Sequence, residues 1–207
     1  MRIKVISEND LLLKHVRGNV ITYMVLLAIF IIGIVCGTLY YKSASNNEEL
    51  LIYVEELIQK VDIEESINFY EALLNSMLKN FGIIILFWIL GASVIGIPIL
   101  MCFVAYKGFS IAFTISTIIS TFGIIKGNIV SFTMLFFQNV ISILMLFVAL
   151  ASAVKLATNL LKNKKDLKIE LLRHTIMCML CMLGLLTASL VEVIFNYKVL
   201  RAILQLV

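Results

Sequence analysis

Apolar residues in this chain gather in five long stretches that contain no charged residue. The stretches cover residues 18–41, 80–106, 108–125, 127–154 and 174–191. A helix that crosses a bilayer needs about 20 mostly apolar residues at 1.5 Å each, and the shortest stretches come close to that length. The pattern predicts an all-α, polytopic membrane protein whose five transmembrane helices form one bundle.

Composition supports this prediction independently. Hydrophobic residues make up 61% of the chain and charged residues 14%, against about 25% charged residues in soluble domains. The 207 residues leave room for a single transmembrane domain over 1–207 and for no second globular domain.

The positions of the lysines and arginines predict the orientation of the bundle. Basic residues gather in the tail 1–17 and in the connection 155–173, which should both be cytoplasmic, whereas the segment 43–80 is acidic and should lie outside. Five crossings then place the N-terminus and Lys107 inside, and Lys126 and the C-terminus outside. Membrane topology therefore explains the net charge of +4. Nucleic-acid binding is not favoured, because no aromatic residues lie among the lysines of the basic run. Attraction to anionic lipid headgroups is a secondary expectation.

The outer segment 43–80 shows helical periodicity, with apolar residues at three- and four-residue steps and acids on the other face. Ser45 with Glu48, and Asp62 with Glu65, mark two helix starts. Two interpretations stay open: a helical hairpin that lies on the bundle, or a surface that receives an extracytoplasmic partner. The segment has no His, Cys or nucleophile paired with a base, so we expect no catalytic site there.

Small residues in the third stretch indicate where a neighbouring helix packs. Gly108, Ala112, Ser116 and Ser120 follow at intervals of four, a stripe that allows close approach of another helix and suggests a central position in the bundle. A hydroxyl-lined path for a solute is the functional alternative.

The second stretch combines Trp88, Gly91, Gly96 and Pro98. Pro98 is the only proline in the chain, and it should bend the helix near its cytoplasmic third because it removes a backbone hydrogen bond.

Polar groups in the last two stretches are the remaining site candidates. Gln138 and Asn139 fall near the midpoint of 127–154, where amides must bond to another helix or to water; an interhelical clamp is favoured over a transport site. Glu192 could reach the headgroups from its helix end, or could point inward as a functional residue. Cys178 and Cys181 lack a second ligand pair, so we expect structural burial and no metal, cofactor or catalytic site.

Together these motifs resemble the stage II sporulation protein M family over essentially the whole chain. The segments that carry the resemblance, in order, are WILGASVIGIP (88–98), KGFSIAFT (107–114), Gln138-Asn139 and Leu190-Val191-Glu192. The family often has prolines around the mid-membrane amides, where this chain has Phe137 and Ile143-Leu144. A helix break in the fourth span is therefore not expected.

The resemblance implies a non-enzymatic membrane scaffold of the engulfment machinery in endospore-forming bacteria. It would sit in the mother-cell membrane at the septum and localise two peptidoglycan-degrading partners, stage II sporulation proteins P and D. Segment 43–80 and the outer loop near Lys126 are the expected contacts, and a homo-oligomer stays open.

The alternative class is a transporter or permease-like subunit that moves a small solute. It is motivated by Gln138, Asn139, Glu192 and the hydroxyls of the third stretch. No inverted repeat and no phosphate-binding loop supports it. An intramembrane protease is not favoured, because no pair of acids or Ser/His constellation stands out in the sequence.

Overall fold

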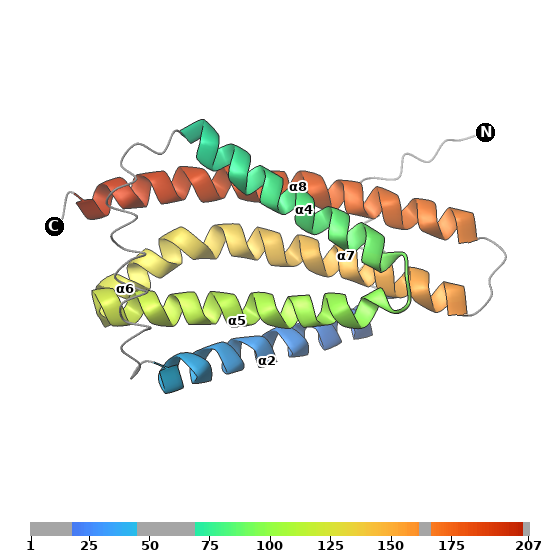
Figure 1. The fold of residues 1–207 in the computed structure, drawn as a ribbon, viewed down its shortest axis with the longest axis horizontal. Coiled ribbons are helices and arrows are strands. Elements are labelled where there is room, and N and C mark those ends of the chain that lie inside the picture. Colours follow the sequence, from blue (N-terminus) through green and yellow to red (C-terminus); the bar gives the residue numbers. More distant parts are fainter. Residues whose placement is uncertain (1–17, 45–68, 162–166, 205–207) are drawn as a thin grey trace.

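The computed structural model describes residues 18–44, 69–161 and 167–204 (Figure 1). The elements of this part are α2 (Val20–Ala44), α4 (Phe69–Gly91), α5 (Gly96–Phe122), α6 (Ile124–Ser131), the π-helical segment η1 (Phe132–Phe136), α7 (Phe137–Leu161) and α8 (Leu167–Leu204). The spans long and apolar enough to cross a membrane are Val20–Ser43, Phe69–Gly91, Gly96–Thr121, Phe137–Leu161 and Lys168–Ile194. The predicted all-α, five-span fold is thus confirmed.

The five long helices alternate in direction along the bundle (Figure 1). We call the end that holds the α4–α5 turn and the beginnings of α2 and α8 the proximal end. The opposite end, where α4 begins and α5 meets α6, is the distal end. This alternation matches the order of crossings that the sequence indicated. Assignment of the proximal end to the cytoplasm stays a prediction from the basic residues.

Two predicted helix boundaries are wrong. The stretch 80–106 is not one helix: it contains the second half of α4, a turn at 92–95 and the first half of α5. Lys107 therefore lies inside α5 and not in a cytoplasmic connection. Residues 69–80 of the predicted outer segment belong to α4, while the helix starts predicted at Ser45 and Asp62 lie outside the described residues.

Pro98 does not bend a helix as predicted, because it lies in the first turn of α5 (Gly96–Phe122). Backbone N–H groups in that turn have no carbonyl partner one turn earlier, so a proline there removes no helical hydrogen bond. The Ser93 hydroxyl accepts a hydrogen bond from the Gly96 backbone N–H at 3.0 Å and so closes the short turn.

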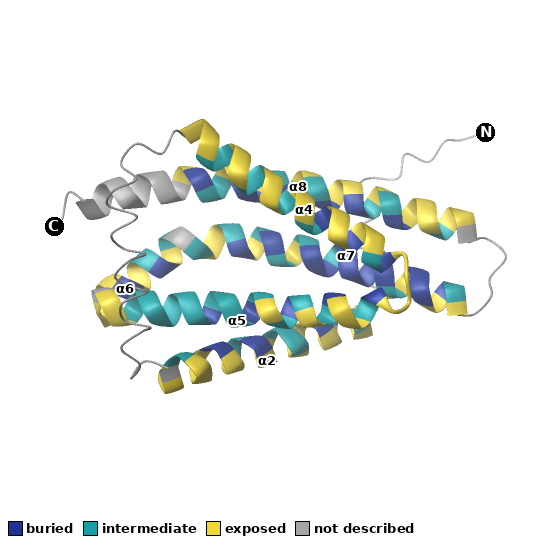
Figure 2. Ribbon diagram, viewed as in Figure 1, coloured by how far each residue is buried: buried dark blue, intermediate teal, exposed yellow. Residues whose placement is uncertain are grey.

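The most deeply buried helix is α7, not the third span as predicted (Figure 2). Small residues fill its second half, including Ala149, Ala151 and Ala153, which are fully buried. Small side chains allow neighbouring helices to approach closely. Large buried residues from the other helices complete the core around α7, namely Leu26, Phe87, Leu100 and Leu185.

Close packing of α2 on α5 confirms the predicted small-residue contact of the third span. A Cβ added to Gly108 would come within 2.5 Å of the Phe30 backbone oxygen. The fit is reciprocal: a Cβ on Gly33 would lie 2.1 Å from the Ala105 oxygen, and one on Gly37 2.4 Å from the Phe109 oxygen. The two backbones therefore touch directly, without side chains between them.

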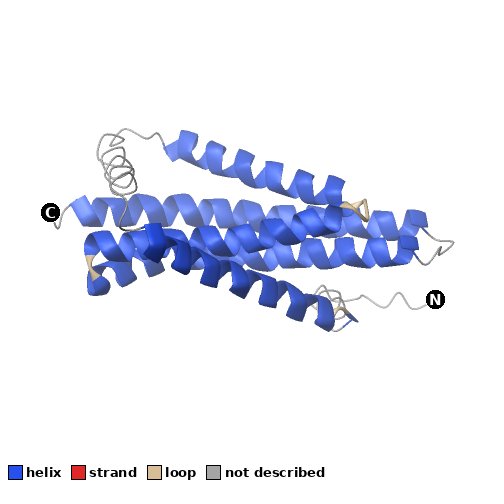
Figure 3. Ribbon diagram, turned by 60° about the horizontal axis from the view of Figure 1, so that its bottom comes forward, coloured by secondary structure: helices blue, strands red, loops and turns tan. Residues whose placement is uncertain are grey.

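At the distal end the chain reverses at Gly123, whose φ of 78° favours glycine. The short helix α6 folds back on α5, since a Cβ on Gly127 would approach the Ile119 Cα to 2.6 Å. The π-helical segment η1 then leads into α7, and the fourth span, Phe137–Leu161, is a single α-helix without a break, as expected. α2 and α4 lie on opposite sides of the finished bundle (Figures 1 and 3).

Candidate functional site

Polar side chains from α4 and α8 meet along one seam of the bundle, which we call the α4–α8 seam. In its distal half the Ser76 hydroxyl donates to Glu192 Oε2 at 2.5 Å. One turn further along α4, Asn80 Nδ2 donates to the Ser189 hydroxyl at 2.7 Å. Glu192, predicted either to reach the headgroups or to point inward, thus faces another helix.

Helical spacing aligns these groups. Ser76, Asn80 and Ile84 follow at four-residue steps on α4 and share one face, because a helix completes a turn every 3.6 residues. On α8 the facing row includes Leu185 and Ser189, both buried. The Ser189 hydroxyl also donates to the Leu185 backbone oxygen at 3.1 Å, which leaves its oxygen lone pairs free to accept from Asn80.

Lys107 brings a positive charge close to this seam from α5. It lies near the middle of the span Gly96–Thr121, and it borders a small apolar recess with Phe30, Ile143 and Phe147. Glu192 and Lys79 are its charged neighbours at electrostatic range. Within the described part of the chain, no hydrogen bond or ion pair engages its ammonium group.

Beside the proximal half of the seam, α7 and α8 form a buried cluster that sequence reasoning missed. The hydroxyl of Ser152 on α7 and Nδ1 of His174 on α8 lie 2.6 Å apart, and Cys178 Sγ lies 3.7 Å from Nε2 of the same ring. His174 is only 1% exposed, and the sequence analysis assigned it no role. The one signal for it in the sequence was its position at the edge of the uncharged stretch 174–191.

Two of the predicted site residues on α4 contact α8 near this cluster. Trp88 donates from Nε1 to the Thr175 hydroxyl at 3.0 Å. Gly91, the last residue of α4, leaves the space in which the imidazole lies, because a Cβ there would come within 2.8 Å of His174 Nε2. Both ends of α4 are therefore tied to α8 by side-chain hydrogen bonds.

The other predicted site residues lie apart from the seam. Gly96 is packed against the end of α4, where a Cβ would lie 2.0 Å from the Leu90 oxygen, whereas Pro98 is exposed. Gly108 belongs to the α2–α5 contact. The seam therefore brings together Glu192, Trp88 and Gly91 of the predicted set, with Lys107 at its side.

Gln138 and Asn139 lie in the first turn of α7, not at the middle of their span. Asn139 is buried, and its Nδ2 donates to the Leu135 backbone oxygen at 2.8 Å. That acceptor belongs to the π-helical segment, where the helical hydrogen-bond pattern is interrupted. The hydrogen bond seen for Asn139 thus supports its own helix; the interhelical clamp stays a prediction.

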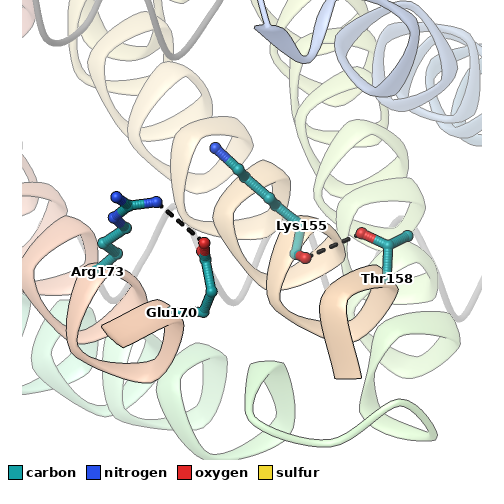
Figure 4. Close-up of polar contacts among 4 residues, drawn as sticks. All are labelled: Lys155, Thr158, Glu170 and Arg173. Atoms are coloured by element: carbon teal, nitrogen blue, oxygen red, sulfur yellow. Dashed lines mark hydrogen bonds and ion pairs between the residues drawn. The ribbon is translucent and has the colours of Figure 1, made fainter. Parts of the chain in front are cut away.

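Charged groups cover the proximal end of α7 and α8 (Figure 4). Arg173 pairs with Glu170 at 3.0 Å, and Lys155 is exposed one turn before Thr158, which donates to the Lys155 backbone oxygen at 2.9 Å. Such exposed pairs contribute little to stability. Their basic excess is what the orientation rule expects on a cytoplasmic side.

The chemistry of the seam is that of hydrogen bonding inside a bundle. In the part of the chain that the structure describes, no group of three His, Cys, Asp or Glu residues is placed to hold a metal ion. Ser152 and His174 do form a close pair, but both are buried, so a substrate could not reach them without the helices separating. The arrangement fixes helices relative to one another.

Comparison with protein-family models gives a match that covers most of the chain. The family model for stage II sporulation protein M matches residues 26–195, a range that begins within α2 and ends just beyond the last span. Searches of curated proteins and of solved structures found no match.

Proposed function

The chain belongs to the stage II sporulation protein M family, and on that basis we propose that it is a non-enzymatic scaffold. It is a multi-pass membrane protein of a sporulation family. In the proposed role it anchors peptidoglycan-degrading partners, stage II sporulation proteins P and D, at the septal membrane of the mother cell during engulfment.

The observation that carries this proposal is the attachment of α4 to α8 at both ends. Ser76 donates a hydrogen bond to Glu192 in the distal half, and Trp88 donates one to Thr175 in the proximal half. α4 follows directly on the acidic segment 45–68, so this segment is joined to a helix of fixed position. A firmly held helix suits a platform for docking, since binding then loses less conformational freedom.

The arrangement of the distal end also favours the proposal. The first residue of α4 and the exposed Lys126 of α6 lie at the same end of the bundle (Figure 1). These are the two places where the sequence indicated contacts for extracytoplasmic partners. A partner outside the membrane could therefore contact both.

Co-purification from membranes of sporulating cells tests the docking surface. Reversing the charge of the acids within 48–65 should lower the recovery of both partners severalfold. The matched control reverses Lys155 and Lys168, exposed at the proximal end, and should leave recovery unchanged provided that membrane levels are equal. Undiminished recovery with the reversed acids would remove the segment from the interface.

A transporter is the second candidate function, because Lys107 lies within a span and near Glu192. Ionisable residues inside membranes often mark solute or proton pathways. Proteoliposomes would show solute flux that is lost in Asn139→Ala or Glu192→Gln. Partner binding that is lost without any change in flux would favour the scaffold.

A further inference from the structure

Charged side chains of α7 and α8 gather at one level of the proximal end. The contact between Ser152 and His174 aligns these two antiparallel helices. Lys155 on α7 and Arg173 on α8 both lie within one helical turn of that contact, and both are exposed. Glu170 pairs with Arg173 at 3.0 Å (Figure 4). We call Lys155, Glu170 and Arg173 the proximal basic surface.

The two cations of this surface lie on the side of α7 and α8 that is turned away from α4. On α7, Ala153 faces α4, because a Cβ added to the last residue of α4 would lie 2.9 Å from the Ala153 Cβ. Lys155 follows two residues later and is therefore rotated by about 200° around the helix. On α8, Thr175 accepts a hydrogen bond from α4. Arg173 precedes it by two residues and is rotated away from α4 in the same manner.

The depth of the cations shows which medium they meet. At 1.5 Å per residue, Lys155 lies about 9 Å along the helix from the end of the span Phe137–Leu161, and Arg173 about 8 Å from the start of the span Lys168–Ile194. Basic side chains near the ends of spans keep their apolar stems in the acyl region and extend the charged group toward the headgroups. The charged groups therefore meet the phosphate layer of the bilayer.

Deeper in the bilayer, the same side of the two helices is apolar. Leu180 follows Arg173 by seven residues, which is close to two full turns, and Leu144 precedes Lys155 by eleven residues, close to three turns. Both leucines are exposed. A ligand that fits this side needs an anionic group at the level of the cations and an apolar part that extends along the leucines.

The charges of the surface select the kind of headgroup. The two cations and the carboxylate leave one net positive charge, which a single phosphodiester would neutralise. Glu170 engages only part of the Arg173 guanidinium, which has five N–H donors and whose side chain is 62% exposed. The remaining donors can bind phosphate oxygens together with the Lys155 ammonium.

We propose that the proximal basic surface binds the phosphodiester of an anionic phospholipid with an uncharged headgroup, such as phosphatidylglycerol. The acyl chains of this lipid lie along Leu180 and Leu144. Basic sites between membrane helices bind anionic lipids in this way. The sequence indicated only a general attraction of the basic connection to such lipids, whereas the structure assigns the contact to one side of α7 and α8.

Lipid-selective quenching tests this site on full-length protein in nanodiscs of phosphatidylcholine with a small fraction of phosphatidylglycerol. A bimane label on Leu180→Cys is quenched by the brominated lipid beside it; the exposed Cys36 and Cys102 are replaced by alanine. The bromine is carried by phosphatidylglycerol in one sample and by an equal amount of phosphatidylcholine in the other. Quenching should indicate a roughly fivefold enrichment of the anionic lipid. A label on Ile31→Cys, exposed in the middle of α2, should show no preference.

Substitutions locate the site. Lys155→Gln should lower the enrichment at Leu180, and Lys155→Gln combined with Arg173→Gln should abolish it. Lys168→Gln is the matched control, because Lys168 is exposed and the change in charge is the same. Lys168 precedes Thr175 by seven residues and therefore lies on the side of α8 that faces α4, so its replacement should leave the enrichment at Leu180 unchanged.

Equal quenching by the two lipids at Leu180 would overturn the proposal. An enrichment that survives the double substitution, or that Lys168→Gln lowers as much as Lys155→Gln does, would also overturn it, because diffuse attraction would explain either result. Loss of the enrichment on adding inorganic phosphate at constant ionic strength would mean that the surface takes a soluble anion and no lipid. These samples contain no protein partner, so the outcome is independent of the proposed function.

Discussion

Replacing Gly33 with alanine should loosen the contact between α2 and α5. The new Cβ would lie 2.1 Å from the Ala105 backbone oxygen. Reaching an ordinary contact of 3.4 Å requires a displacement of about 1.3 Å, and a backbone oxygen cannot rotate away as a side chain can. The two helices must therefore move apart along their crossing.

The expected loss follows from that displacement. A gap of 0.5–1 Å already forfeits a quarter to a half of the dispersion attraction between facing atoms, and overpacking typically costs about 1–3 kcal/mol. Alanine regains up to about 1 kcal/mol because it favours the helix more than glycine does. Because the contact is with backbone atoms, the upper part of this range, about 2–3 kcal/mol, applies. After the gain from alanine is subtracted, the free energy of unfolding should fall by about 1–2 kcal/mol.

The matched control is Gly82→Ala on α4, where an added Cβ meets nothing within 4 Å. Cys178 and Cys181 are buried in the core, so their modification by a thiol reagent across a titration with sodium dodecyl sulfate reports unfolding. The exposed Cys36 and Cys102 are first replaced by alanine. Gly33→Ala should unfold at lower denaturant and Gly82→Ala at equal or higher denaturant; coincident curves for the two variants would refute the backbone contact.

Three further changes can be measured with the same assay. Gly91→Ala should cost about 1–3 kcal/mol, because its Cβ would meet the His174 ring at 2.8 Å and the Cβ of the fully buried Ala153 at 2.9 Å, and an alanine has no rotation that relieves the contact. Asn80→Ala removes two interhelical hydrogen bonds, to the Ser189 hydroxyl at 2.7 Å and to the Leu185 backbone oxygen at 3.4 Å. It should cost at least about 0.6 kcal/mol, the average for one such bond in membranes; a cost near zero would mean that these bonds add nothing. Ser152→Ala deprives the buried imidazole of its hydroxyl partner and should cost about 1–3 kcal/mol, whereas the exposed Thr158→Ala should stay within about 0.5 kcal/mol.

The sequence was sufficient to predict the five spans, because an uncharged apolar run is a local property of the chain. It also indicated the contact face of the third span, since Gly108 and Ala112 already lie at the spacing that close packing needs. The partner helix could have been found as well: Gly33 and Gly37 on α2 show the same four-residue spacing, and the structure places both against α5.

The helix boundaries were predicted less well, because a single charged residue, Lys107, was interpreted as the connection between two helices. Lys107 interrupts the apolar run, yet it is tolerated inside α5 where it is half-buried and near Glu192. That carboxylate lies 85 residues later in the chain, so no local pattern could reveal it. The turn at 92–95 has a weak sequence signal of its own, namely Ser93 within it and the flanking Gly91 and Gly96.

The seam could be predicted only in part. Glu192 was recognisable as an acid in an apolar helix, but its bond to Ser76 joins residues far apart in the chain. The pairing of Ser152 with His174 depends on how α7 and α8 are aligned, and this alignment follows from packing. Spacing within one helix can indicate a face; it cannot identify the residue on the next helix that the face will contact.

The short turn between α4 and α5 has a consequence for biogenesis. Because only residues 92–95 join the two helices, neither can be integrated into the membrane long before the other. A lysine near the middle of α5 adds about 2.5–3.5 kcal/mol to the free energy of inserting this helix alone, whereas α4 is apolar enough to accompany it. We therefore expect the translocon to release α4 and α5 into the lipid as one helical hairpin.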